Sequence, residues 1–331
     1  MQLNKNIKIF LNYFLGPLLF VWLAFSIYRQ ILKQPHLEAS WLHIRHSLQS
    51  INILNLLIVI LLMIANWGIE AKKWQLSVAS IHKINFLTAF KAVLSGVAFS
   101  VTMPNRIGEY FGRILYMPDG HRLKTISVTL VGSVSQLYVT IISGVIGLLF
   151  LKNRLIENGF VNEIVYRFII AGFSFVLLVL TVIYFKIAVI EKLFESRIKA
   201  SPYLYLIESL RTFNVQLLLR ILLLSFLRYL VFLVQYFLMF SLFNIALPFV
   251  FVWSVVSVLF LVLAVIPTIA LIEVGLRGEI SLRLMGMFTT NSLGISLTSV
   301  TIWFINLVLP AIVGSILFLG LKVFKRKNER N

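Results

Sequence analysis

The sequence predicts an all-α integral membrane protein, a polytopic helix bundle with about six full spans plus two re-entrant or broken helical hairpins. Of the 331 residues, 60% are hydrophobic and 13% are charged, and the mean hydropathy is +0.95. A soluble domain averages about 25% charged residues. Apolar runs long enough to cross a bilayer, roughly 20 residues each, recur along the whole chain. We therefore expect a single transmembrane domain over residues 1–331.

The spans follow from these runs in chain order. The first run has a basic flank like that of a signal peptide, but it contains Gly16 and Pro17 and meets no small-residue cleavage site before Arg29. It is therefore predicted to be an uncleaved first helix. The six predicted spans are Ile9–Tyr28, Ile51–Ile69, Ile126–Leu151, Phe168–Phe185, Val215–Phe243 and Leu293–Leu321.

Two shorter apolar runs end at a proline and continue into charged sequence. A helix that stops at membrane depth is tolerated only where protein or water satisfies the freed backbone groups. Such interruptions in corresponding halves of a chain are typical of inverted-repeat transporters. We predict re-entrant hairpins or broken helix pairs at Phe86–Met117 and Phe249–Met285, in possible repeat halves 51–165 and 215–321. The predicted structural breaks are Pro104, Gly108, Pro267 and Gly275.

The basic residues predict the orientation. If both hairpins return to the side from which they start, 18 Lys and Arg residues, including Lys72 and Lys73, lie on one side and six lie on the other. The positive-inside rule then places the basic side and both termini in the cytoplasm. The net charge of +18 is accordingly interpreted as membrane topology, and no nucleic-acid partner is expected.

Six further arginines lie in or beside apolar runs. Each charge at the centre of a bilayer costs on the order of 3 kcal/mol on insertion scales. These arginines must therefore face partners, water or an anionic ligand, which indicates a polar interior. They are Arg106, Arg113, Arg220, Arg228, Arg277 and Arg283.

The first charged cluster follows Pro104. Glu109 and Arg113 are four residues apart and share a helix face, so the simplest interpretation is an intrahelical ion pair. Arg106, three residues before Glu109, leaves the cluster with excess positive charge. A helix that begins after Pro104 also directs its free amide groups toward the break. An arginine fork beside such a helix start suits a phosphate, which is the second interpretation.

The second charged cluster follows Pro267 and is balanced in charge. One interpretation is a ladder of salt bridges along one helix. The other makes Glu273 a titratable group, which could couple transport to protons, or a ligand for a cationic headgroup. The cluster consists of Glu273, Arg277, Glu279 and Arg283.

Two spans are predicted to form the walls of the site. Small and polar residues follow a 3–4 spacing in Ile126–Leu151, which favours either tight helix packing or a lining role, and Gln136 favours the lining role. Arg228 and Gln235 share a face of Val215–Phe243. Together with the two clusters, this predicts a substrate-binding set of Arg106, Glu109, Arg113, Gln136, Arg228, Gln235, Glu273 and Arg277.

Several classes of chemistry are disfavoured. The chain has no cysteine, so disulfides and thiol catalysis are excluded. It contains no Walker A loop, no GxSxG elbow and no HExxH motif, which argues against ATP-driven pumping and hydrolase chemistry. We expect no cofactor, no metal site and no recognisable catalytic domain.

The sequence resembles the lysylphosphatidylglycerol synthase transmembrane, or flippase-like, domain family. The resemblance rests on NWGIEAKKWQ at Asn66–Gln75, MPNRIGEYFGR at Met103–Arg113, RYLVFLVQYFL at Arg228–Leu238 and the proline-glutamate stretch Ile266–Gly275. It implies a multi-pass protein of the bacterial inner membrane that moves lipid to the outer leaflet. The cytosolic synthase domain of the family's best-understood members has no counterpart here, so a stand-alone member is expected.

These observations lead to an expected function as a lipid translocase for an anionic or aminoacylated phospholipid or a polyprenyl-phosphate lipid. The expected partners are membrane lipids and a separate lipid-modifying or glycan-assembly enzyme. The alternatives are a membrane enzyme or accessory subunit in lipid or polyprenyl-linked glycan assembly, or a small-solute transporter. The translocase interpretation expects Glu109 and Arg113 to meet Glu273 and Arg277 near the middle of the membrane.

Overall fold

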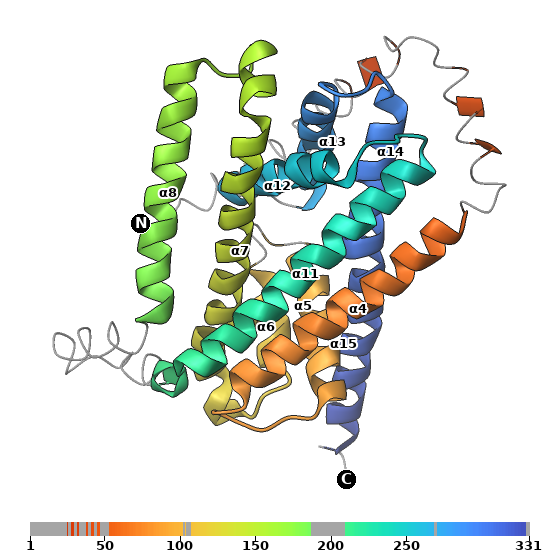
Figure 1. Ribbon diagram of the computed structural model, residues 1–331. Coiled ribbons are helices and arrows are strands. Elements are labelled where there is room, and N and C mark those ends of the chain that lie inside the picture. Colours follow the sequence, from red (N-terminus) through yellow and green to blue (C-terminus); the bar gives the residue numbers. More distant parts are fainter. Residues whose placement is uncertain are drawn as a thin grey trace, which may run out of the picture.

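A computed structural model describes residues 53–101, 103, 107–186, 209–267 and 270–328, together with scattered residues between 25 and 46. For 270, 271 and 320–328 it describes the backbone only. The described residues form an all-α bundle without strands (Figure 1). The predicted first span, Ile9–Tyr28, lies almost entirely outside the described residues, as do Pro104 and Arg106.

Five described helices are long and apolar enough to cross a membrane. They match five of the six predicted spans, so the protein is a multi-pass membrane protein with an all-α bundle fold. They are α4 (Ile53–Val78), α7 (Arg122–Glu157), α8 (Glu163–Phe185), α11 (Val215–Leu242) and a last span made of α14 (Ser292–Trp303), a π-helical turn (Phe304–Val308) and α15 (Leu309–Asn328).

Helix starts are set by asparagine caps. The side chain of Asn162 accepts a hydrogen bond from the backbone N–H of Val165 at 2.8 Å, which satisfies a donor that the first turn of α8 leaves free. Asn214 does the same for α11, Asn291 for α14, and Asn85 for α5 (Phe86–Ser100).

The first predicted hairpin is a pair of antiparallel helices, α5 and α6 (Gly108–Ile114). Their backbones touch at glycines, since a Cβ on Gly96 would lie 2.8 Å from the carbonyl oxygen of Glu109. A Cβ on Gly112 would lie 2.7 Å from the carbonyl carbon of Ser95, and one on Gly108 would lie 2.6 Å from the amide nitrogen of Ser100. Only glycine permits this approach, which places α6 flat against α5.

The second predicted hairpin is a broken pair, α12 (Phe249–Val265) and α13 (Ala270–Met285). The backbone is extended at Ile266, because the residue before a proline is disfavoured in the helical conformation. The break therefore falls at Ile266 and Pro267. Gly275, which we predicted to be a second break, lies buried inside α13 instead. A glycine costs a helix about 1 kcal/mol relative to alanine, too little to end it when the flanking turns are packed.

The bundle is built around α4, α7 and α11. Helices α4 and α11 run antiparallel and side by side, α7 contacts both, and α5–α6 packs between α4, α7 and α15 (Figure 1). Helix α12 crosses α7 at two glycines, where a Cβ on Gly144 would lie 2.6 Å from the Leu261 side chain. Gly144 and Gly147 therefore serve helix packing, one of the two roles proposed for that small-residue face.

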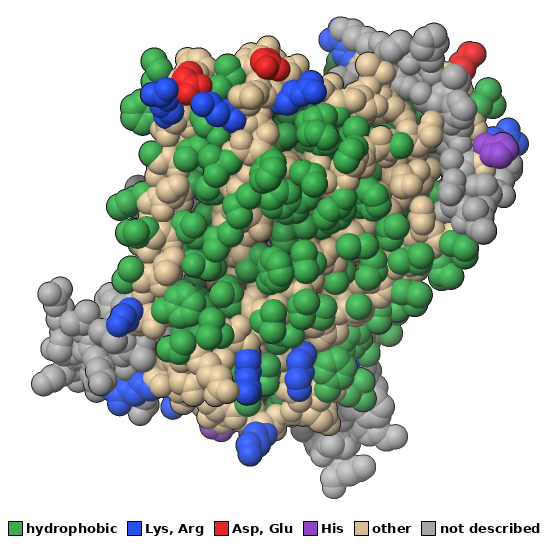
Figure 2. Space-filling model, viewed as in Figure 1, with side chains coloured by type: hydrophobic (Ala, Val, Ile, Leu, Met, Phe, Trp, Pro, Cys, Tyr) green, Lys and Arg blue, Asp and Glu red, His purple; other side chains and the backbone are tan. Residues whose placement is uncertain are grey.

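Helix α8 lies at the edge of the bundle, and only 6% of its most apolar window is buried, so its side chains face the lipid (Figure 1). On the face shown in Figure 2, a broad apolar belt separates two charged ends. This is the surface expected of a protein whose belt lies in hydrocarbon.

Candidate functional site

A buried charged cluster lies where α4, α6 and α11 meet. Asn66, Glu70 and Lys73 follow a 3–4 spacing and therefore share one side of α4. Helix α4 runs beyond Ile69, where the predicted span Ile51–Ile69 ends, and continues to Val78. Lys73, which we had assigned to a cytoplasmic loop, is consequently buried within the bundle.

Glu70 is the centre of this cluster. Its Oε1 lies 3.0 Å from Nη1 of Arg113, and its Oε2 lies 2.7 Å from Nζ of Lys73 and also pairs with Nη1 of Arg228. The four side chains are 3–10% exposed. A carboxylate can be buried in this way only when opposite charges and hydrogen bonds offset its desolvation, which here three cations do.

Two of these cations have further partners. Nε of Arg228 donates to Oδ1 of Asn66 at 2.7 Å, and its guanidinium lies 5.4 Å above the Trp67 ring centroid. Nζ of Lys73 donates to the carbonyl of Gly132 at 3.3 Å and to Ser225 at 3.4 Å, which ties α4 to α7 and α11. The cluster thus fixes the relative positions of the three central helices.

Helix α6 adds the predicted ion pair. Nη2 of Arg113 lies 2.9 Å from Oε2 of Glu109, four residues earlier, while its Nη1 reaches Glu70 on α4. The simplest interpretation of this cluster, an intrahelical pair, is therefore correct, but it is incomplete. Arg113 also joins the re-entrant hairpin to the core of the bundle.

The second pair lies on α13. Nη2 of Arg277 lies 2.6 Å from Oε1 of Glu273, its Nη1 donates to the hydroxyl of Tyr236 at 2.9 Å, and its guanidinium lies 5.7 Å above the Phe260 ring centroid. Glu279 pairs with Arg283 at 2.9 Å, but the Arg283 side chain is largely exposed. The predicted salt-bridge ladder is present, with one rung buried and one at the surface.

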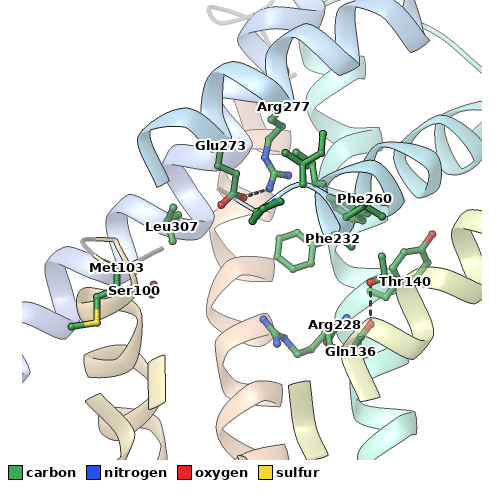
Figure 3. Close-up of a pocket in the computed structure, with 16 residues that line it drawn as sticks. Ser100, Met103, Gln136, Thr140, Arg228, Phe232, Phe260, Glu273, Arg277 and Leu307 are labelled. Carbon is green, nitrogen blue, oxygen red and sulfur yellow. Dashed lines mark hydrogen bonds and ion pairs between the residues drawn. The ribbon is translucent and has the colours of Figure 1, made fainter. Parts of the chain in front are cut away.

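A cavity of about 590 Å³ lies between the two charged groups. Glu273 and Arg277 approach it from α13 on one side, and Arg228 and Gln136 approach it from α11 and α7 on the other (Figure 3). Its volume falls within the range of small-molecule sites. The rest of its lining is mainly apolar: Met103, Phe232, Phe260, Leu263, Ala264, Val265, Ile266, Pro267 and Leu307, with Ser100, Thr140 and Tyr229 as polar exceptions.

Two polar groups at this cavity lack partners among the described residues. Nε and Nη1 of Arg228 are used by Asn66 and Glu70, whereas Nη2 has no acceptor there. Oε1 of Gln136 is buried without a donor, although its amide nitrogen donates to the Ser225 carbonyl at 3.4 Å. The buried Gln136 oxygen therefore offers an acceptor to a polar group in the cavity, and Arg228 offers a donor.

The cavity also has an apolar rim. Val265, at the end of α12, is 61% exposed, and Ile266 and Pro267 are exposed beside it. These residues lie at the helix break, where a side opening can be lined by protein without leaving backbone groups in hydrocarbon.

The remaining predicted site residues lie elsewhere. Nε2 of Gln235 donates to the Val59 carbonyl at 2.9 Å and so ties α11 to α4 rather than lining the cavity. Glu109 and Arg113 are also not among the lining residues and connect with the cavity through Glu70 and Arg228. The cavity brings Arg228, in place of Arg113, together with Glu273 and Arg277.

Glu70, Lys73 and Asn66 are absent from the predicted site. Their signal was present in the sequence, because NWGIEAKKWQ places an amide, a carboxylate and an ammonium on one face of a helix that continues from an apolar run. In the described part of the chain, no group of three or more His, Cys, Asp or Glu side chains is arranged to hold a metal ion. Comparisons with protein-family models, with curated proteins and with solved structures found no match.

Proposed function

We propose that this protein is a lipid translocase of the flippase-like kind. It binds the polar head of an anionic or aminoacylated phospholipid, or of a polyprenyl-phosphate lipid, and moves it across the membrane while the acyl chains stay in the bilayer. The observation that carries this proposal is the cavity between the two charged groups, in which the Nη2 group of Arg228 has no acceptor among the described residues. The resemblance of residues 66–75 and 103–113 to flippase-like domains favours the same function.

The charges around the cavity support an anionic headgroup. Among the described residues, the two charged clusters beside it hold four cations and three carboxylates, so one positive charge is in excess: Lys73, Arg113, Arg228 and Arg277 against Glu70, Glu109 and Glu273. An excess cation at membrane depth is costly unless a counter-charge is nearby. A phosphate oxygen meets this need and matches the planar donors of a guanidinium.

The apolar rim supports a lipid over a water-soluble substrate. Val265 and Ile266, at the end of α12, line the cavity and are exposed, and we propose that they border a side opening toward the lipid. A polar head could pass this rim from the side while its hydrocarbon tails remained in lipid. The apolar rim would not stabilise a water-soluble substrate.

We further propose that the protein resides in the bacterial inner membrane with both termini in the cytoplasm. In Figure 2 the lower end carries basic but no acidic side chains on the face shown, and α15 ends there, whereas the upper end carries both signs. The positive-inside rule assigns the lower end to the cytoplasm. A separate lipid-modifying or glycan-assembly enzyme is the partner that would supply or consume the lipid.

Leaflet exchange in proteoliposomes tests the function. The purified protein should accelerate exchange of labelled phosphatidylglycerol, and Arg228→Gln or Arg277→Gln should slow it about tenfold or more, as expected for loss of a charge-assisted contact of at least 1.4 kcal/mol. Arg283→Gln is the matched control, because Arg283 also pairs with a glutamate four residues earlier but at the surface. It should leave the rate unchanged.

Other results would replace this proposal with an alternative. No acceleration for any anionic or aminoacylated lipid, or full activity in Arg228→Gln, would refute it. Conversion of a polyprenyl-phosphate by the purified protein without exchange would identify a membrane enzyme. Uptake of a water-soluble compound into sealed vesicles would identify a solute transporter.

A further inference from the structure

Glu70 holds more cations than its ionic balance needs. One carboxylate is shared by Lys73, Arg113 and Arg228, which come from three helices, and both of its oxygens are occupied. Links from α4 to α6 and to α11 would require only the contacts with Arg113 and Arg228, and Lys73 is on α4 itself. The concentration of three cations on one carboxylate is the pattern of an anion site whose anion is supplied by the protein itself.

The same cluster has more donors than acceptors. Nδ2 of Asn66 and Nε of Arg113 are buried without a partner in the described part of the chain, and their side chains are fully or almost fully buried. Because an unsatisfied buried N–H is costly, the cluster favours an additional group with several acceptor oxygens, which a phosphate supplies.

Arg228 connects this cluster with the cavity. Its Nε and Nη1 are held by Asn66 and Glu70, and the residue also lines the cavity wall (Figure 3). An anion that occupies the cavity therefore meets Arg228 before it meets Lys73 or Arg113. The approach of a second anion to the same guanidinium weakens its attraction to Glu70 by electrostatic repulsion.

We infer that Glu70 is a resident counter-anion, which a phosphate-type oxyanion replaces on Arg228 when the cavity is filled. The inference rests on the proposed function and adds a residue that positions the cations between binding events. When the ligand is released, the ion pair between Glu70 and the Arg228 guanidinium forms again. Because Arg113 pairs with the same carboxylate, this exchange also changes the contact between Glu70 and the α5–α6 hairpin.

The exchange predicts opposite effects of Glu70→Gln on binding and on turnover. In proteoliposomes with increasing fractions of labelled phosphatidylglycerol, the half-saturating fraction should fall about tenfold, because the competing anion is gone. The maximal rate should also fall about tenfold, because no carboxylate recovers Arg228 on release. Each tenfold change corresponds to about 1.4 kcal/mol. A purely structural role would reduce the folded fraction and leave the half-saturating fraction unchanged.

Two further variants separate exchange from folding. Glu70→Gln combined with Lys73→Met removes one charge of each sign, so the cluster keeps its net charge, and it should show the same lowered half-saturating fraction. Glu70→Asp keeps the anion and should keep the wild-type half-saturating fraction. Glu163→Gln is the control, because Glu163 pairs with Lys152 and Arg167 at the surface, and it should change neither quantity.

A second set of measurements distinguishes a lipid from free phosphate and the inference from the proposed function. If the wild type moves lipid but neither charge-removing variant shifts the half-saturating fraction, or neither variant folds, the inference is wrong and the translocase proposal stands. A different outcome is that the wild type moves no lipid, while inorganic phosphate raises the melting temperature of Glu70→Gln more than that of the wild type. In that case the translocase proposal fails, but the exchange on Arg228 is supported with free phosphate as the anion. Absence of both effects refutes the exchange.

Discussion

Arg277 illustrates how a single arginine is accommodated in the bundle. Its guanidinium pairs with Glu273, donates to Tyr236 and lies above the Phe260 ring, so charge, hydrogen bonds and an aromatic face together replace water. Its Nε remains without a partner among the described residues. Removal of a further acceptor of Arg277 should therefore lower the stability of the protein.

We expect Tyr236→Phe to destabilise the protein by about 2 kcal/mol, since hydrogen bonds to charged groups contribute roughly 1.5–3 kcal/mol. Nη1 of Arg277 loses the acceptor at 2.9 Å and remains buried. Thermal unfolding in detergent measures the loss. Tyr110→Phe is the control, because the one described partner of the Tyr110 hydroxyl is the neutral Ser133 at the surface. Equal losses in the two variants would contradict this account of Arg277.

The residue scale also separates the six arginines predicted to need partners. Arg113, Arg228 and Arg277 are buried and paired, whereas Arg220 and Arg283 are exposed. Arg106 lies outside the described residues. The free-energy cost of inserting an arginine could not separate these residues, because burial depends on which face of each helix turns toward the bundle.

At the scale of elements, glycines decide how the α5–α6 hairpin closes. Helix α6 is only seven residues long, too short to be stable alone, and it is held by backbone contact with α5. Gly96 and Gly112 lie against one another in this contact. The position of Arg113, and hence its bond to Glu70, depends on that approach.

Gly112→Ala should therefore destabilise the protein by about 3 kcal/mol, the upper end of the usual cost of overpacking, because the clashing atoms are backbone and cannot rotate away. Gly172→Ala provides a matched control within α8, since a Cβ there meets nothing within 4 Å. We expect this change to be neutral or slightly stabilising. Thermal unfolding of both variants tests the hairpin, and an unaffected Gly112→Ala would show that α6 does not pack as described.

At the scale of the whole molecule, the charged ends of the bundle imply an orientation. The loop between α4 and α5 carries Lys83 at the lower end, and α7 ends with Glu157 at the upper end. The chain contains no cysteine, so single introduced cysteines report on accessibility without background.

A membrane-impermeant maleimide should label Glu157→Cys in intact spheroplasts and Lys83→Cys only after the membrane is permeabilised, because the proposed orientation places the basic end in the cytoplasm. Both positions are exposed, so burial does not confuse the result. Labelling of Lys83→Cys alone in intact spheroplasts would invert the topology. The proposed placement of both termini in the cytoplasm would then be wrong.

Composition and apolar run length predicted the bundle correctly. Because lipid demands about 20 apolar residues per span, α4, α7, α8, α11 and the last span could be located from the sequence. Pro267 also marked a real interruption, since α12 ends just before it, whereas Pro104 lies outside the described residues. The inverted repeat over 51–165 and 215–321 remains a prediction.

The site was only partly predictable. Spacing along one helix paired Glu109 with Arg113 and Glu273 with Arg277, because such pairs depend on local geometry alone. The pairing of Glu70 with Arg228 spans 158 residues and depends on which faces of α4 and α11 meet. Periodicity identifies a helix face but not its partner, so the sequence determined the membrane spans and local ion pairs, and only helix packing brought Glu70, Arg113 and Arg228 together beside the cavity.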